Sequence, residues 1–363
     1  MNVPFVDLKK QHKVLGKEIK KAIGSVLNKA NLIMGDELLE FEKQFAKYIG
    51  FKYAVGVGSG TGALHLSLLA CDIGKGDEVI IPANTYIADA LAVEYTGASF
   101  KLVDVDEDYY IITPHILHNS ISKKTKVAIP VHLYGQACDI NAMNKIKGIT
   151  IIEDCAQSAG CKPNGRQAGS TNMGCFSFYP AKNLGACGDG GMITTNDKEL
   201  YNKLMALRNY GSQKKYYNDF IGYNCRLDTI QAAILMVKLK YLDEWNEARR
   251  RAACTYADFL AECKGVIMPK IYLDHVWHLF VIRVNRNIRK SFMDYLRKNG
   301  IGVHLHYPIP IHKQKCFSDR KLGSFPVTER LAEEVVSLPM FPEITRIQIK
   351  YTCDKIKDFF IRR

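Results

Sequence analysis

Lys182 lies in a setting that favours chemical reactivity. It follows an apolar run, residues 175–179, that predicts a buried strand, and a proline and a glycine-rich segment enclose it within GCFSFYPAKNLGACGDGG. A lysine held out of water has a pKa that falls from about 10.4 towards neutrality, because desolvation disfavours the charged form. The neutral amine is then a nucleophile that can form a Schiff base with a carbonyl. Taken alone, an ordinary loop lysine is the simpler interpretation, so the rest of the chain has to decide.

A carboxylate precedes this lysine at the end of another apolar run. Asp154 follows residues 149–153, which predict a buried strand, and the small-residue stretch CAQSAG comes after it. One interpretation of Asp154 is a helix N-cap. The other is a partner for a protonated ring nitrogen, and holding such a proton by two pKa units is worth about 2.7 kcal/mol. The local sequence leaves both interpretations open.

A glycine-rich turn, GSGTG at residues 58–62, connects a predicted strand at 53–57 to a predicted helix at 63–71. Free backbone N–H groups at a helix N-terminus bind phosphate, and glycines let it approach closely. The dinucleotide motif G-x-G-x-x-G is not matched, so a phosphate cradle is the better interpretation. With Tyr86, which follows a predicted strand, the chain offers a phosphate cradle, a ring stack, a carboxylate and an amine. Those are the groups that a protein supplies to pyridoxal phosphate.

Short apolar strands alternate with helices through the first two thirds of the chain, and these elements must position the site. Strands are predicted at 53–57, 78–82, 99–103, 126–133, 149–153, 175–179 and 190–195, with helices at 36–50, 63–71, 86–95, 139–147 and 198–208. This alternation predicts an α/β fold in which a mostly parallel sheet is covered on both faces. Ligands bind such sheets at the carboxyl ends of the strands.

The C-terminal third has a different pattern. A long amphipathic helix is expected from Asp228 to about residue 253, long enough to bridge two domains. A strand at 277–284 and helical segments at 291–298 and 327–336 follow it, which predicts a smaller α+β domain. We therefore expect a large cofactor-binding domain at 1–240 and a small C-terminal domain at 241–363.

Composition narrows the class of protein. The 363 residues carry a formal charge of +13, but the basic residues are spread over predicted helices without interleaved aromatic residues, so no nucleic-acid groove is predicted. No run of about 18 apolar residues and no signal-like segment is found, so we expect no membrane span and a cytoplasmic location. The eleven cysteines form no C-x-x-C pair, which favours reduced thiols. His304, His306 and His312 lack the spacing of a zinc site, and no metal is expected.

Six long segments are similar to one known family. They are GSGTGALHL, IIPANTYIADALAVEYTGA, VHLYGQACDI, IIEDCAQSAG, FSFYPAKNLGACGDGGMITTND and GYNCRLDTIQAAIL. Together they resemble the nucleotide-sugar aminotransferases of the DegT/DnrJ/EryC1/StrS group over nearly the whole chain. The resemblance implies the fold-type I, aspartate aminotransferase-like architecture with a seven-stranded sheet. It also implies pyridoxal 5′-phosphate as cofactor, L-glutamate as amino donor and a homodimer with shared active sites.

The resemblance also assigns roles to individual positions. Lys182 matches the Schiff-base lysine, Asp154 the partner of the pyridinium nitrogen, and Tyr86 the residue that stacks on the ring. Further cofactor positions match Gly60, Thr61, Gln157 and Ser177, together with Asn224, which by analogy would reach the phosphate of the neighbouring subunit. Positions in stretches that line the sugar-nucleotide site are Tyr179, Tyr217, Arg226 and His306.

The details look most similar to enzymes that aminate C3 of a dTDP-linked 3-keto-6-deoxyhexose for surface glycans, through LRNYGSQKKYYN and HVWHLFVIR. In those enzymes a histidine commonly follows the AQ-x motif, whereas here that position is Ala159. Amination at C4 of dTDP-4-keto-6-deoxyglucose therefore stays as an alternative. A related sugar dehydratase has histidine in place of the lysine, so Lys182 counts against that activity. A cofactor-binding regulator without catalysis is a further alternative.

Overall fold

A seven-stranded sheet forms the centre of the computed structural model, which describes residues 1–214 and 216–361. Its strands are β1 (Tyr53–Val57), β2 (Glu78–Pro82), β3 (Ser99–Val103), β4 (Thr125–Ala128), β5 (Thr150–Asp154), β6 (Met173–Ser177) and β7 (Gly191–Thr195). They lie in the order β1-β7-β6-β5-β4-β2-β3, and β7 runs antiparallel to both of its neighbours while the other pairs are parallel. The predicted α/β fold with a mostly parallel sheet is confirmed.

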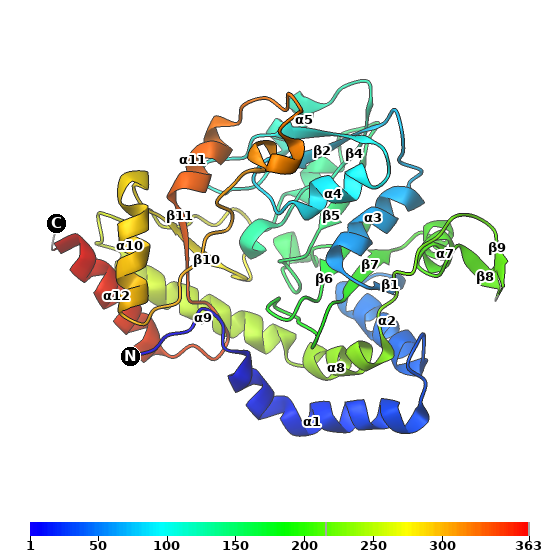
Figure 1. Ribbon diagram of the computed structural model, residues 1–363, viewed down its shortest axis with the longest axis horizontal. Helices are drawn as coiled ribbons and strands as arrows, with labels where there is room; N and C mark the ends of the chain where they lie inside the picture. The colour runs from blue at the N-terminus through cyan, green and yellow to red at the C-terminus, as the bar shows by residue number, and fades with distance from the viewer. Residues whose placement is uncertain (215, 362–363) are drawn as a thin grey trace.

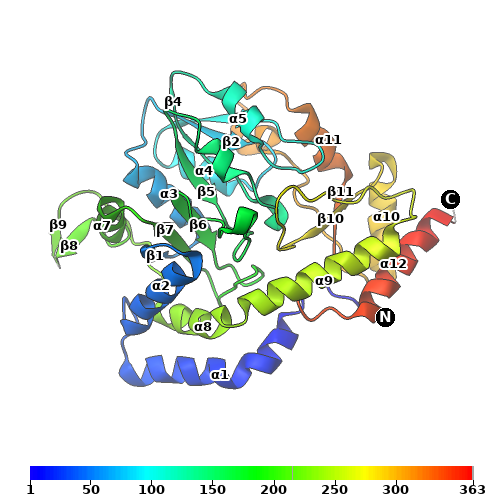
Figure 2. The same cartoon turned by 180° about the vertical axis from the view of Figure 1, so that it is seen from behind.

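Helices cover both faces of this sheet (Figures 1 and 2). One face packs against α3 (Gly60–Ala70), α4 (Ala88–Glu94) and α7 (Lys198–Leu207), and the other against α2 (Asp36–Ile49), α8 (Thr229–Leu239), α5 (Pro114–Ser120) and α6 (Ile140–Met143). Successive residues of a strand point to opposite faces. On β5, Ile152 packs on the α3 side and Ile151 on the other. By the same alternation Asp154 faces α3 and Glu153 faces away from it.

The C-terminal elements gather at one end of the molecule, and the hairpin of β8 (Ser212–Lys214) and β9 (Tyr217–Asn218) projects at the other (Figure 1). The first group contains α9 (Leu242–Leu260), β10 (Phe280–Arg283), α10 (Arg286–Lys298), β11 (Val335–Leu338) and α12 (Arg346–Ile361), with the N-terminus beside α12. Between α10 and β11 the chain returns to the large sheet through α11 (Pro326–Glu334), and side chains near it join the core of the α3 face. The boundary at 240/241 stays a prediction.

The long helix expected from Asp228 is two helices. Between α8 and α9, the N–H of Tyr241 bonds to the carbonyl of Lys238, three residues earlier, and not to the fourth residue back as in a regular α-helix. The φ angle of Tyr241 is −106°. The two helices also pack on different partners: α8 lies against α1 (Leu8–Lys29) and α2, whereas α9 lies against α12. Each partner fixes its own helix direction, so the chain bends at the junction.

Other expected boundaries differ more locally. The predicted strand 126–133 is reduced to β4, because the chain turns at Tyr134, whose φ is +61°. The predicted helix 139–147 is only α6, and α3 begins at Gly60 instead of residue 63. Among the described residues, none of the helices has the length and apolar character needed to cross a bilayer. A cytoplasmic location stays a prediction.

Candidate active site

A cavity of about 450 Å³ opens at the carboxyl ends of β5 and β6. Its walls are formed by Ser59, Gly60, Thr61, Leu64, Thr85, Tyr86, Ala88, Asp154, Ala156, Gln157, Ser177, Tyr179, Lys182, Asp189 and Tyr307. Eight residues singled out from the sequence therefore come together here from segments far apart in the chain. They are Gly60, Thr61, Tyr86, Asp154, Gln157, Ser177, Tyr179 and Lys182.

The N-terminus of α3 forms one wall of the cavity. Ser59 caps this helix, since its hydroxyl accepts a 3.0 Å hydrogen bond from the N–H of Gly62. Within the described part of the chain, the N–H groups of Gly60 and Thr61 find no acceptor, as expected for the first turn of a helix. A Cβ at Gly60 would lie 2.7 Å from the Cβ of Ser177, so only glycine lets helix and strand approach this closely. The result is an anion-binding helix end beside a serine hydroxyl.

Lys182 sits on a loop that buried contacts hold in place. Its N–H bonds to the carbonyl of Tyr179 at 2.8 Å, which closes a turn directly after β6. The next residue, Asn183, is buried and donates to Asn246 of α9 at 2.8 Å and to the carbonyl of Val276 at 3.1 Å. The Nζ of Lys182 makes no hydrogen bond or ion pair with any residue that the structure describes. Its amine is left free to react.

Burial changes the pKa values of Lys182 and Asp154, two ionisable groups of the cavity. Desolvation lowers the pKa of Lys182 to about 8, against the opposing attraction of Asp154 and Asp89. Desolvation also raises the pKa of Asp154, although the N–H of Ala156 at 2.8 Å and the Lys182 ammonium both favour its ionised form. At pH 7 a lysine with this pKa is neutral in roughly one molecule in ten, far more often than a lysine in water, so a reactive amine is available.

Three aromatic or amide side chains, those of Gln157, Tyr86 and Tyr307, form another part of the cavity wall. Gln157 accepts from the N–H of Tyr134 at 2.6 Å and donates to the hydroxyl of Tyr307 at 3.1 Å. The ring of Tyr307 lies 5.4 Å from that of Tyr86, which is itself 55% exposed. Burial raises the pKa of Tyr307, so its hydroxyl remains protonated. These contacts fix Gln157 and leave the Tyr86 ring accessible to a planar ligand.

Four of the expected site residues do not line this cavity. Asn224 pairs with Asn209 in an isolated bridge, and Arg226 donates to the Asn209 side chain at 3.0 Å. Tyr217 is 62% exposed on the β8–β9 hairpin. The side chain of His306 points towards β11 instead, because its Nδ1 lies 2.8 Å from the hydroxyl of Ser337 and its ring stacks on Phe5. Within one chain, the cavity is thus incomplete relative to the expected set.

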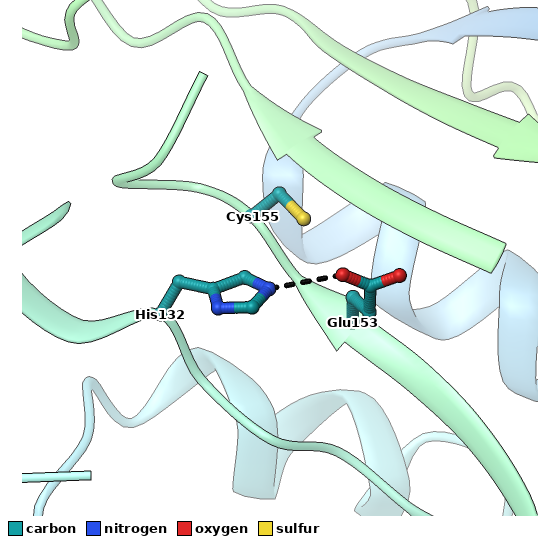
Figure 3. A group of neighbouring side chains, drawn as sticks. All are labelled: His132, Glu153 and Cys155. Atoms are coloured by element: carbon teal, nitrogen blue, oxygen red, sulfur yellow. Dashed lines mark hydrogen bonds and ion pairs between the residues drawn. The ribbon is translucent and has the colours of Figure 1, made fainter. Parts of the chain in front are cut away.

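Figure 3 shows a second group of buried polar side chains, His132, Glu153 and Cys155. Since side chains alternate along β5, Glu153 lies on the face opposite to Asp154. His132, Glu153 and Cys155 approach closely enough to hold a metal ion. However, His132 Nδ1 accepts from the N–H of Cys138 at 3.0 Å, so the proton is on Nε2, which donates to Glu153 at 3.0 Å. Burial raises the pKa of the Cys155 thiol well above its usual value. Hydrogen bonds occupy both ring nitrogens of His132 and both carboxylate oxygens of Glu153, so we interpret the group as a structural network.

Comparison with known proteins decides the family. The model of the DegT/DnrJ/EryC1/StrS aminotransferase family matches residues 13–357. The chain belongs to this aminotransferase family. It is 46% identical to the dTDP-3-amino-3,6-dideoxy-α-D-galactopyranose transaminase of Aneurinibacillus thermoaerophilus, covering 98% of this chain and 99% of the relative. It is 45% identical to the UDP-N-acetyl-3-dehydro-α-D-glucosamine 3-aminotransferase of Acidithiobacillus ferrooxidans, covering 96% and 95%.

A solved structure of the family agrees closely with the fold. The crystal structure of DesV from S. venezuelae superimposes with a TM-score of 0.96 at 41% identity, covering 99% of this chain and 98% of that one. The chain is therefore a nucleotide-sugar aminotransferase, and members of this family work with pyridoxal 5′-phosphate.

The cavity fits that cofactor. A phosphate would meet the free N–H groups of Gly60 and Thr61, and Asp154 offers a buried carboxylate that accepts a hydrogen bond from the N–H of Ala156. Lys182 offers an unpaired amine. When bound, pyridoxal phosphate supplies an aldehyde that condenses with amines and a protonated ring that takes up electrons.

Sequence reasoning missed several residues that line the cavity. Ser59 had a usable signal, since serine is a preferred N-cap residue directly before a helix. Tyr307 directly follows His306, which was expected to face the site in its place. Asp189 lies in the glycine-rich segment after Lys182 and carries no distinguishing pattern. Spacing alone does not tell which of two neighbouring side chains points inward.

Proposed function

We propose that this enzyme transfers the amino group of L-glutamate to C3 of a dTDP-linked 3-keto-6-deoxyhexose. The observation that carries the proposal is the 46% identity, over almost the full length of both chains, to a relative named for a dTDP-3-amino-3,6-dideoxy sugar. The open cavity beside Lys182, with exposed Tyr86 and Tyr179 at its mouth, offers aromatic surface for a large substrate. The product would serve as an amino sugar for surface glycans.

In this proposal each cavity residue has one task. Lys182 would hold the cofactor through its Nζ and, when free, would serve as the base and acid that moves a proton at the reacting carbon. Asp154 would keep the ring nitrogen protonated, while Gly60, Thr61 and Ser177 would bind the phosphate. Tyr86 would stack on the ring, and Gln157 would contact it from the cavity wall.

The position that kept C4 amination open is not in the cavity. Ala159 is buried, and its carbonyl accepts a 2.9 Å hydrogen bond from Asn246 of α9. Its side chain belongs to the core on the α2 face of the sheet and does not line the cavity, so the missing histidine says little about the ring carbon. The relative that acts on a UDP sugar is also a 3-aminotransferase by name, which favours C3 but leaves the nucleotide to be tested.

The test uses the holoenzyme with L-glutamate and dTDP-4-keto-6-deoxyglucose, with and without a 3,4-ketoisomerase. NMR of the product locates the new amino group, and release of 2-oxoglutarate measures the first half-reaction. We expect a 3-amino sugar only when the isomerase is present. Amination in its absence would show a C4 enzyme, and turnover of a UDP-linked 3-keto sugar in preference to the dTDP sugar would reassign the carrier.

We also propose a homodimer whose two sites are shared. Large apolar side chains are exposed near the α8 and α7 side of the molecule, among them Ile33 (49%), Leu39 (51%) and Ile221 (86%). Asn224 lies next to Cys225, whose sulfur stands behind Gly62 at the phosphate cradle, yet Asn224 does not line the cavity of its own chain. A second copy seated on the exposed apolar side chains would cover them and could present its Asn224.

Mixing two variants tests this sharing. In the proposed dimer each site takes Lys182 from one subunit and Asn224 from the other. A dimer of one Lys182→Ala subunit and one Asn224→Ala subunit would therefore contain one site with both residues intact. After co-refolding, statistical pairing predicts recovery of roughly a quarter of wild-type activity. A monomeric mass by light scattering, or no recovery from a mixture shown to contain mixed dimers, would contradict the shared site.

A further inference from the structure

A second buried carboxyl group, Asp89, lies close enough to Asp154 for the two side chains to share a hydrogen bond. It belongs to α4, whose apolar residues pack on the α3 face of the sheet, and it is 0% exposed. The hydroxyl of Thr85 donates a 2.7 Å hydrogen bond to Oδ2, whereas Oδ1 has no hydrogen-bond partner within the described residues. A buried carboxylate oxygen without a donor is costly. The orphaned oxygen therefore carries a proton more readily than a charge.

Of the four titratable groups around Asp89, only one is a base. The titratable groups facing it are Asp154 at the end of β5, Lys182, Tyr307 and Cys175 of β6. Burial, and then the charge of Asp154, raise the pKa of Asp89 well above its usual value. Burial also raises the pKa values of Tyr307 and Cys175, which stay neutral. Two carboxyl groups in contact, with one ammonium nearby, retain one proton between them.

We propose that Asp89 is a positioning residue that carries a proton at neutral pH and donates a hydrogen bond from Oδ1 to the carboxylate of Asp154. Thr85 fixes Oδ2 as an acceptor, so the proton is directed to Oδ1. Asp154 then has two donors, the N–H of Ala156 at 2.8 Å and the Asp89 hydroxyl. Both stabilise its ionised form and hold its orientation towards the cavity. The donor thereby secures the charge that a cofactor ring nitrogen needs opposite it.

A purely structural role is the competing explanation. In that case Asp89 serves only to accept the Thr85 hydroxyl near the start of α4. The two explanations differ in what Asp89 does for Asp154, so the test replaces the donor without changing the size of the side chain. Asp89→Asn keeps an N–H donor, whereas Asp89→Leu has a similar shape and no donor.

The first measurement uses holoenzyme loaded with pyridoxal phosphate labelled with ¹⁵N in the ring, whose NMR shift reports ring protonation. Wild type and Asp89→Asn are expected to hold the ring proton at neutral pH, while Asp89→Leu loses part of it. Asp89→Leu should lower kcat about tenfold, the effect of one pKa unit at the ring nitrogen, with KM for glutamate changed less than about twofold. A protonated ring in Asp89→Leu, or equal damage in Asp89→Asn, would overturn the proposal.

A second measurement does not depend on whether Asp89→Leu folds. The infrared spectrum of wild-type apo protein at neutral pH should contain a carboxylic acid C=O band that Asp89→Asn lacks; its absence would overturn the proposal. The inference rests on the proposed role of Asp154 but not on the identity of the sugar. If Asp154→Asn left the ring protonated, the role of Asp154 would fail, even with the Asp89 band present.

Discussion

Two adjacent residues of β5, Glu153 and Asp154, are both buried carboxyl groups, yet their surroundings differ in every respect. Glu153 accepts from His132 at 3.0 Å, from the N–H of Gly169 at 2.8 Å, and from both the N–H and the hydroxyl of Thr171. Asp154 accepts a hydrogen bond from the N–H of Ala156 and, in our proposal, a second from Asp89, and otherwise it faces the cavity. One carboxylate is saturated with donors and the other is left in need of them.

This difference separates stability from chemistry within a single strand. A saturated buried network stabilises one arrangement of the chain, because each group would be costly to leave unpaired. An unsaturated carboxylate costs stability, but it retains the capacity to pair with a ligand. On β5 the alternation of side chains between the two faces assigns these roles to successive residues.

The largest expected effect comes from removing the amine on the cavity side. Lys182→Ala should lower kcat by about 1,000-fold or more, because both covalent attachment and proton transfer are lost. It should keep the thermal unfolding midpoint within a few degrees and abolish the visible absorbance of the lysine-bound cofactor. Lys203→Ala, at a surface lysine paired with Asp72, is the control and should change neither. If Lys182→Ala still turned over the sugar, the cavity beside Asp154 would not be the catalytic side of β5.

On the opposite face the change should appear in stability. Glu153→Ala leaves His132 and the 169–171 loop without their acceptor, and breaking a buried pair of this kind costs about 3–5 kcal/mol in unfolding free energy. Urea unfolding of the apo protein measures it. The fraction that remains folded should still bind cofactor with the wild-type spectrum. A stable variant with an altered spectrum would place Glu153 in the chemistry instead.

Asp154→Asn should show the reverse pattern. A neutral amide cannot hold a proton on the ring nitrogen, and loss of two pKa units there is worth about 2.7 kcal/mol, or about 100-fold in kcat. The apo protein should be at least as stable as wild type, because burial already disfavours the ionised carboxyl group. Steady-state kinetics and urea unfolding of the same preparation give both numbers. A large loss of stability would show that Asp154 is structural.

The smallest effect is a pH dependence set by Lys182. With a pKa of about 8, its reactive neutral fraction falls about tenfold for each pH unit below that value. Stopped-flow capture of pyridoxal phosphate by apo protein should therefore accelerate up to about pH 8 and then level off. The unfolded chain keeps this proton up to about pH 10.4, so apo stability should also rise with pH between these values. A midpoint of capture near 10 would show that the lysine is not desolvated.

Much of the fold could be predicted because the apolar periodicity of each segment and the turn or capping residues at its ends indicated the same element. The strands at 53–57, 78–82 and 99–103 match the structure, and Gly50 ends α2 in the left-handed conformation that its C-terminal position indicated. The prediction of one long helix after Asp228 was wrong. The apolar stripe continues across Tyr241, but the bend there depends on packing against α1 and α2 on one side and α12 on the other. Helices α1 and α12 lie in segments for which no helix was predicted.

The candidate site shows the same limit. Gly60, Asp154 and Lys182 follow predicted strands, and the ends of neighbouring strands converge, so the sequence order sufficed to bring them together. His306 and Tyr307 lie on an irregular segment, where no period tells which side chain faces the cavity. Asp89 is an acidic residue within a mostly apolar helix, and Asp154 is 65 positions away in the sequence. Its importance depends on a tertiary contact that no local pattern records.

The register of β5 against β6 therefore determines more than the shape of the sheet. Residues Ile152, Glu153 and Asp154 oppose Met173, Gly174 and Cys175. If β5 slipped by one residue, each of its side chains would point to the opposite face of the sheet. Glu153 would then lie in the cavity, and Asp154 would lie beside His132. A chain misfolded in this way would retain the same residues and almost the same sheet, and yet it would be inactive. Enzyme activity in this protein is thus a direct report on the fidelity of strand pairing during folding.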